Sequence, residues 1–142
     1  GGGGNDISIT RLSADGTTVL AATFLGGSMN DRPEGVTVDA AGNLYFTGTT
    51  TSPNFPITSL AHGLTGPRDA MVVALSADLT VLRYASCHGG TGDEYGRGVA
   101  VSAAGTVWFG GETTSADLPM SNAFQSQNGG GTSDAFITSF AP

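Results

Sequence analysis

The chain has no lysine, and charged residues make up only 12% of its 142 positions. Its five basic residues are arginines scattered along the sequence without clustering: Arg11, Arg32, Arg68, Arg83 and Arg97. Nucleic acids and anionic membrane surfaces are both bound through clusters of basic side chains. The 12 acidic residues bring the formal net charge to −7. We therefore expect that the protein neither binds nucleic acid nor inserts into a membrane.

Groups that perform chemistry are also scarce. One cysteine, Cys87, excludes an intrachain disulfide, and we interpret it as a small buried apolar residue. His62 and His88 are the only histidines, and neither has the converging ligands that a zinc site needs. No phosphate-binding loop and no nucleophile elbow is present. We therefore predict no catalytic residue, no metal site and no cofactor, so the protein is not expected to be an enzyme.

Three further absences limit the ways in which the protein can interact with its surroundings. No apolar run approaches the roughly 18–20 residues of a membrane-spanning helix. The acidic pair Asp93-Glu94 lacks the alternating carboxylates of calcium loops, so we interpret it as a solvated acidic turn. The sequence has no Asn-x-Ser/Thr motif, which excludes N-linked sugar by that route.

What the chain has instead is an internal repeat rich in glycine. Residues 6–61 align with residues 69–124 at a constant shift of 63, with 21 identities in 56 positions. The longest match sets GVTVDAAGNLYFTGTTTS against GVAVSAAGTVWFGGETTS. A third copy begins at Asp134, where DAFITSF echoes DAMVVAL. A period of this length indicates a stacked repeat architecture.

Each repeat contains four short apolar segments, which we name c, d, a and b in chain order. They are rich in Val, Ile, Thr and aromatic residues and have the length of strands. In the first repeat they are Ile7–Leu12, Thr18–Leu25, Gly35–Asp39 and Leu44–Gly48, and in the second Ala70–Leu75, Val81–His88, Gly98–Ser102 and Val107–Gly111. Turn signals such as Asp15-Gly16 separate them. Four antiparallel strands per repeat are typical of a propeller blade.

The predicted fold is therefore all-β, with tandem four-stranded antiparallel blades of the β-propeller type. About two repeats of 63–65 residues are followed by a third, partial copy. We divide the chain into a flexible glycine-rich leader (1–5), repeat 1 (6–68), repeat 2 (69–133) and the start of a third repeat (134–142), which would be a closing or donated strand.

The order of these motifs resembles the bacterial beta-propeller repeat known as the SBBP repeat. The run GVTVDAAGNLYFTGTTTSPNFP is followed by a loop and DAMVVALSAD, and the second copy continues through LPMSNAFQSQNGGGTSDAF. The resemblance implies secreted or cell-surface bacterial proteins of poorly defined function, and it brings no catalytic motif. The chain departs from the family in having only two complete periods, where a closed ring needs several.

Segment c occurs three times, whereas a, b and d occur twice. Unpaired strand edges can pair with another chain. We therefore hypothesise that one copy completes a blade of the next, giving a ring or surface fibre built from copies of this chain. The residues assigned to inter-chain strand pairing are Ile7, Ile9, Leu12, Phe136, Ile137 and Phe140. The alternative is a carbohydrate- or protein-binding propeller module excised from a longer secreted, adhesin-like protein.

The b strands end in hydroxyl-rich segments that we expect to be exposed. Thr49, Thr50, Thr51, Thr113 and Thr114 could carry O-linked sugar, so glycans are a further expected partner. Each aromatic pair of strand b, Tyr45-Phe46 and Trp108-Phe109, should place one ring between blades and leave the other for core packing or for sugar stacking.

Overall fold

The structure is a computed structural model that describes residues 3–58 and 62–141. Within these residues it contains nine β-strands and no helix. The strands are β1 (Ile7–Leu12), β2 (Val19–Leu25), β3 (Asp31–Val38), β4 (Leu44–Thr50), β5 (Asp69–Leu75), β6 (Leu82–His88), β7 (Glu94–Val101), β8 (Val107–Thr113) and β9 (Asp134–Phe140). The predicted all-β fold is confirmed.

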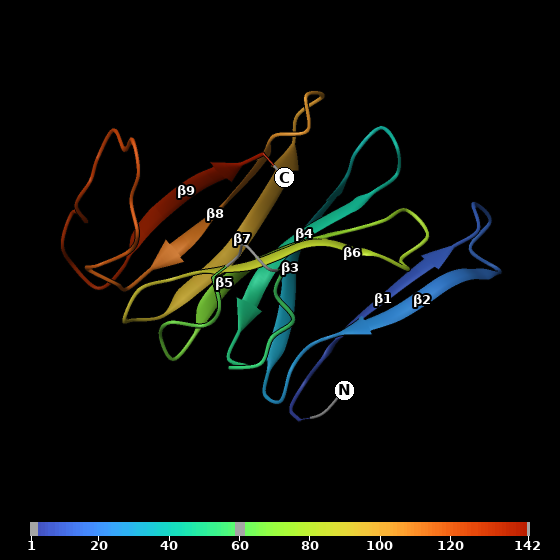
Figure 1. The fold of residues 1–142 in the computed structure, drawn as a ribbon, viewed down its shortest axis with the longest axis horizontal. Helices are drawn as coiled ribbons and strands as arrows, with labels where there is room; N and C mark the ends of the chain where they lie inside the picture. The colour runs from blue at the N-terminus through green and yellow to red at the C-terminus, as the bar shows by residue number, and fades with distance from the viewer. Residues whose placement is uncertain (1–2, 59–61, 142) are drawn as a thin grey trace.

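The strands form three antiparallel sheets that follow one another along the chain. Their orders are β1-β2, β3-β4-β5-β6 and β7-β8-β9. The middle sheet is one complete blade with strands a, b, c and d, while the first sheet holds only c and d and the third only a, b and c. Figure 1 shows the β1-β2 hairpin and the β7-β9 sheet on opposite sides of the middle sheet.

Strand β5 lies at the centre of the molecule and is buried along its whole length. Met71 and Val73 point into a cluster shared with the first sheet, whereas Ala70 and Val72 point into a cluster shared with the third sheet. Adjacent side chains of a strand point to opposite faces. The continuous apolar run of β5 therefore follows from its position in a sheet covered on both faces.

The two strands of type a, β3 and β7, begin four residues earlier than the sequence predicted, at Asp31 and Glu94. A β-bulge interrupts each of them, between Pro33 and Gly35 and at the equivalent place in β7, between Gly96 and Gly98. A bulge resets the alternation of side chains, and proline within a run argues against a strand. The bulge hid the first half of each strand, and in β3 Pro33 did so as well.

The turn between strands c and d has the same form in both repeats. Gly16 has a φ of 73°, and Leu79 occupies the equivalent position with a φ of 62°. In the second turn the Ser76 hydroxyl donates a 2.5 Å hydrogen bond to the Asp78 carboxylate, which also accepts one from the Thr80 hydroxyl at 2.9 Å. These hydrogen bonds lower the pKa of Asp78 to about 2, with the bond from Ser76 as the largest cause.

A buried carboxylate joins the d-to-a loop to the end of strand b. Asp31 accepts hydrogen bonds from the hydroxyls of Thr50 at 2.5 Å and Ser52 at 2.9 Å, and from the Gly27 amide at 2.7 Å. The Asp31, Thr50 and Ser52 side chains are all buried. We call this arrangement the carboxylate clasp.

The second repeat builds the same clasp with a longer acid. Glu94 accepts hydrogen bonds from Thr113 at 2.6 Å, from Ser115 at 2.5 Å and from the Gly90 amide at 2.9 Å. Glu94 is fully buried. Each clasp lies where the chain crosses from one sheet to the next. It therefore holds the first residue of β3 or β7 in position.

Asn5, the last residue of the predicted glycine-rich leader, is hydrogen-bonded to the loop between β2 and β3. The Asn5 amide donates to the Asn30 side chain at 3.1 Å, and the Asn5 carbonyl accepts from the Asp31 amide at 2.7 Å. These bonds hold Asn5 in place, and the flexibility of the leader as a whole stays a prediction. Residues 1–2 of the predicted leader lie outside the described residues.

Replacing the turn serine should raise the pKa of its aspartate. In Ser76→Ala, the pKa of Asp78 should rise from about 2 toward its ordinary value of 3.8, because the largest stabilising hydrogen bond of the carboxylate is lost. Since the folded-state pKa is depressed, this turn contributes stability above the ordinary pKa and loses it as the pH falls toward 2. NMR titration of the Asp78 carboxyl carbon measures the change. Ser13→Ala is the matched control, in which only the pKa of Asp15 should rise. An unchanged pKa of Asp78 in Ser76→Ala would contradict the assignment.

Neutralising the clasp should destabilise the fold. In Glu94→Gln one carboxylate oxygen becomes an amide nitrogen, so either the Gly90 amide or the Thr113 and Ser115 hydroxyls lose their acceptor. The free energy of unfolding should therefore fall by about 2–4 kcal/mol. Urea denaturation measures this loss. Glu112→Gln, an exposed site in the neighbouring strand, should cost less than about 1 kcal/mol. Equal losses in the two variants would show that the clasp is no more important than a surface carboxylate.

Candidate functional site

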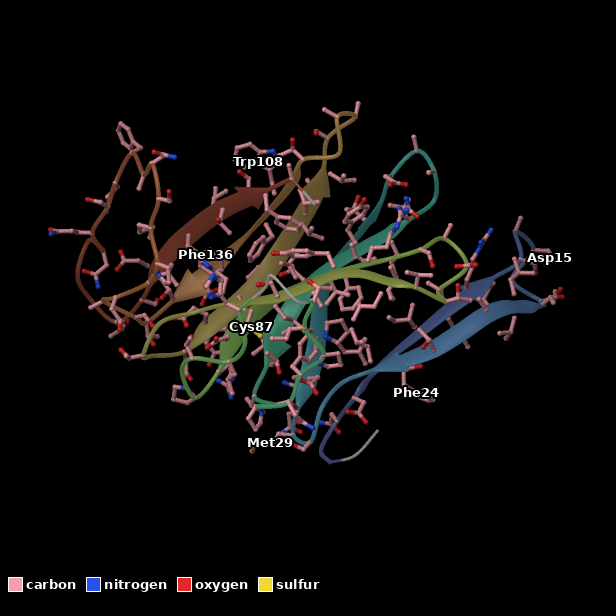
Figure 2. All side chains as sticks on the ribbon, in the orientation of Figure 1. Asp15, Phe24, Met29, Cys87, Trp108 and Phe136 are labelled. Carbon is pink, nitrogen blue, oxygen red and sulfur yellow. The ribbon has the colours of Figure 1, made fainter. Side chains whose placement is uncertain are left out.

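The two end sheets each leave one apolar face uncovered. On the β1-β2 hairpin this face carries Leu12, Val19 and Phe24, and the Phe24 side chain is 71% exposed. Figure 2 shows Phe24 directed away from the rest of the molecule. On the β7-β9 sheet the open face carries Trp108, 49% exposed, and Ile137, 79% exposed. We call these surfaces the front face and the back face.

The front face repeats a surface that is buried elsewhere in the same chain. At the shift of 63, Leu12 corresponds to Leu75 and Phe24 corresponds to Cys87. Leu75 and Cys87 lie in the core cluster where the middle sheet packs on the first sheet. The front face therefore occupies the repeat positions that form one half of a sheet-to-sheet interface in the middle sheet.

The back face repeats the complementary half. Trp108 corresponds to Tyr45, and Ile137 corresponds to Val72 at the shift of 65 that relates β9 to β5. Tyr45 and Val72 are both buried where the middle sheet packs on the third. In the second repeat the strand-b aromatics lie as predicted, since Phe109 is buried and Trp108 is half exposed. In the first repeat both aromatics are buried, Phe46 in the cluster shared with the first sheet and Tyr45 in the cluster shared with the third.

The six residues assigned to inter-chain pairing divide into two groups. Four of them pack inward against the core clusters: Ile7, Ile9, Phe136 and Phe140. Leu12 and Ile137 point outward instead and belong to the front and back faces. The strands that carry them, β1 and β9, each pair with a single neighbour and so have one open edge. Pairing of these edges between chains stays a prediction.

Cys87 and His88 point to opposite faces of β6, as their adjacency predicted. Cys87 is buried in the cluster shared with the first sheet, and Figure 2 places it at the centre of the molecule. Burial raises the pKa of its thiol to about 12. The His88 ring contacts Phe109 and Phe136, with centroids 5.9 and 5.4 Å apart, and burial lowers its pKa. Both side chains therefore pack within the fold.

The acidic pair Asp93-Glu94 differs from the expected solvated turn. Glu94 is buried in its clasp, whereas Asp93 is partly exposed and lies 3.8 Å from Arg68. Within residues 3–58 and 62–141, no three His, Cys, Asp or Glu side chains come together in a way that could hold a metal ion. The same part of the chain contains no helix long and apolar enough to cross a membrane.

The threonines expected on exposed loops are mostly inside the fold. Thr49, Thr50 and Thr113 are buried, and the hydroxyls of the last two serve the clasps. The expectation of exposure was wrong for these three. For Thr50 and Thr113 the reason is that a buried carboxylate accepts a hydrogen bond from the hydroxyl. Thr114 is exposed and Thr51 is partly exposed. Sugar attachment at these two positions stays a prediction.

Three of the five arginines lie close together in space, although all five are scattered along the sequence. Arg32, Arg68 and Arg97 line one hollow together with Tyr95. They come from strands β3 and β7 and from the residue before β5. Their separation along the chain hid this cluster, and only the packing of β3 against β7 reveals it. Arg11 and Arg83 lie outside the hollow.

Comparison with known protein families identifies the repeat. The model of the beta-propeller repeat, SBBP, matches residues 23–56, which run from the end of β2 through β3 and β4. No curated protein matches the chain at a significant level. The chain therefore contains a beta-propeller repeat of the SBBP type, as the sequence resemblance predicted, and its sheets have the antiparallel arrangement of such repeats.

The buried thiol should resist chemical labelling. With a pKa of about 12, roughly one Cys87 thiol in ten thousand is ionised at pH 8, and its sulfur is enclosed by the core. A chromogenic disulfide reagent should therefore react with one thiol per chain in 8 M urea and with almost none in buffer. Fast, complete labelling of the folded protein would mean that the interface between the first two sheets opens.

Proposed function

We propose that this protein is a non-catalytic structural module that assembles head to tail with copies of itself. A single observation carries the proposal: the exposed front and back faces repeat the two halves of an interface that the chain already forms internally. The front face of one copy would pack on the back face of the next. The internal interfaces support this proposal, because each of them joins one such half to the other between adjacent sheets.

The side chains of the two faces are suited to such a contact. Leu12, Val19 and Phe24 on the front face and Trp108 and Ile137 on the back face are all large apolar residues at least 49% exposed. Large apolar groups gathered on one exposed surface of a soluble protein typically mark an interaction site. Burying them against each other removes apolar area from water, which is the main driving force for association.

The geometry of a head-to-tail contact sets the form of the assembly. Such a contact closes into a ring when the rotation between copies allows it and otherwise continues as a filament. Two copies would bring six sheets together, since each copy has three. Propellers contain roughly four to eight blades, so a closed ring of two copies is within the usual range.

Strand exchange is the other way in which the two ends could join. The β7-β8 pair of one copy would then supply the a and b strands that the β1-β2 sheet of the next copy lacks. That arrangement would cover Val36 and Val38, which are exposed although their repeat equivalents Val99 and Val101 pack against the second core cluster. It also requires β1 to displace β9 from β8, whereas contact between the faces displaces no strand. We therefore favour contact between the faces.

A secreted or cell-surface location is part of this proposal. It rests on the resemblance of the repeat to bacterial extracellular proteins, and a ring or surface fibre would function there. The rival function is a module that binds carbohydrate or protein, and it is favoured by the arginine-lined hollow between β3 and β7.

Molecular mass in solution tests the assembly. Light scattering after size exclusion should give at least twice the 14.2 kDa mass of one chain, and Phe24→Asp should return the protein to a monomer because it places a charge in the contact. A wild-type monomer at about 100 μM, where an interface with micromolar affinity is nearly saturated, would reject self-assembly.

Two further variants identify the mode of assembly. Ile137→Asp should dissociate copies joined through their faces and leave strand exchange intact, because strand exchange displaces β9. Val36→Asp should do the reverse, since that side chain is covered only in strand exchange. Both positions are exposed in a single copy, so circular dichroism and thermal melting of each variant should match those of the parent protein.

A further inference from the structure

We propose that the arginine-lined hollow is a binding site for an acidic saccharide, recognised through a sugar carboxylate. The hollow has a volume of about 510 Å³ and lies between β3 and β7, the strands of type a in the second and third sheets. It gathers three of the five basic residues of a chain whose net charge is −7. This site is separate from the front and back faces, so it does not depend on self-assembly.

Strands β3 and β7 bring the charged groups together because they pack closely and because each contains a bulge. A side chain at Gly35 would approach the Arg97 carbonyl to 2.8 Å, and one at Gly96 would approach the Thr47 hydroxyl to 2.3 Å, so only glycine permits this contact between the sheets. Glu34 and Arg97 are the residues at the two bulges. A bulge redirects a side chain away from the regular alternation, and both of these side chains line the hollow.

Two of the arginines are held in place by neighbours. Arg68 donates a hydrogen bond to the Tyr95 hydroxyl and lies 3.8 Å from Asp93. Arg97 donates to Glu112 at 3.2 Å and lies 3.7 Å from Glu34. Both guanidinium groups are close to the Tyr95 ring, 5.0 and 5.2 Å from its centroid. The hollow is thus ordered before any ligand arrives.

Arg32 has a different environment. Among the described residues its side chain forms no hydrogen bond and no ion pair, although it lines the same hollow. A guanidinium presents a planar set of donors that matches a carboxylate in two parallel hydrogen bonds. Arg32 is therefore the group with donors available for an incoming anion.

The repeat provides an internal comparison for these positions. Residues that the fold needs recur at the shift of 63, as Thr50 and Ser52 recur in Thr113 and Ser115. Thr51 of the hollow recurs as Thr114, but most of its other residues do not recur. The equivalent residues differ in size and charge in four pairs: Asn5 and Arg68, Arg32 and Tyr95, Glu34 and Arg97, Thr49 and Glu112. The cluster is therefore not a requirement of the blade.

The remaining lining groups indicate the class of ligand. Asn5, Asn30, Thr49 and Thr51 surround the arginines with amides and hydroxyls, which suit the hydroxyl groups of a sugar. A long polyanion such as a nucleic acid would be repelled by the acidic remainder of the chain. A small uronic-acid saccharide satisfies both constraints, since it carries one carboxylate per ring and many hydroxyls.

Calorimetric titration with a disaccharide of galacturonic acid tests the site. We expect binding in the millimolar range or tighter, weakened about tenfold or more in Arg32→Gln because a charge-assisted pair of hydrogen bonds is lost. Arg83→Gln removes an arginine outside the hollow and should bind as the parent does. Added salt should weaken binding to the parent protein, since the attraction is electrostatic.

Two other probes separate the carboxylate from the sugar. The neutral galactose disaccharide should bind at least tenfold more weakly than the acidic one, and sodium acetate should bind more weakly as well because it lacks the hydroxyl groups. Equal binding of the neutral disaccharide would overturn recognition of the carboxylate. Equal binding of acetate would overturn recognition of the saccharide. No heat from the acidic disaccharide at 10 mM would overturn the site as a whole.

Discussion

A blade sheet has two apolar faces, and the structure depends on covering both of them. The middle sheet achieves this with one neighbour on each side, which allows β5 to be buried from end to end. Each end sheet has a single neighbour and leaves one face in solvent. The same repeat position is then core in one sheet and surface in another, as Cys87 and Phe24 show. Neighbouring sheets, more than residue type, decide which side chains are exposed.

The carboxylate clasps make this stacking regular. Each one lies where the chain passes from one sheet to the next, and it ties that crossing to the end of strand b. Because a buried carboxylate without its hydrogen-bond donors is very unfavourable, the crossing has one arrangement that satisfies Asp31 or Glu94. Successive sheets are therefore placed in the same way, which in turn brings β3 close to β7 and assembles the hollow lined by arginine.

Much of the fold could be predicted because it rests on local patterns that occur twice. Strands c, d and b and their turns follow from alternation and from residues such as Asp15-Gly16. The first halves of β3 and β7 were missed because bulges interrupt their alternation. The burial of Thr50 and Glu94 was missed because polar residues indicate exposure, and their partners lie about twenty positions away. The arginine cluster needs contacts between separate sheets, which no linear pattern reports.

The sequence repeat and the structural blade are out of phase. Repeat 1 supplies strands c and d to one sheet and strands a and b to the next, so the boundary of the duplicated unit falls in the middle of a blade. Insertion or loss of one 63-residue unit by recombination would leave c-d at the start and a-b-c at the end. The number of such units can therefore change during evolution without altering the faces that neighbouring sheets present to each other.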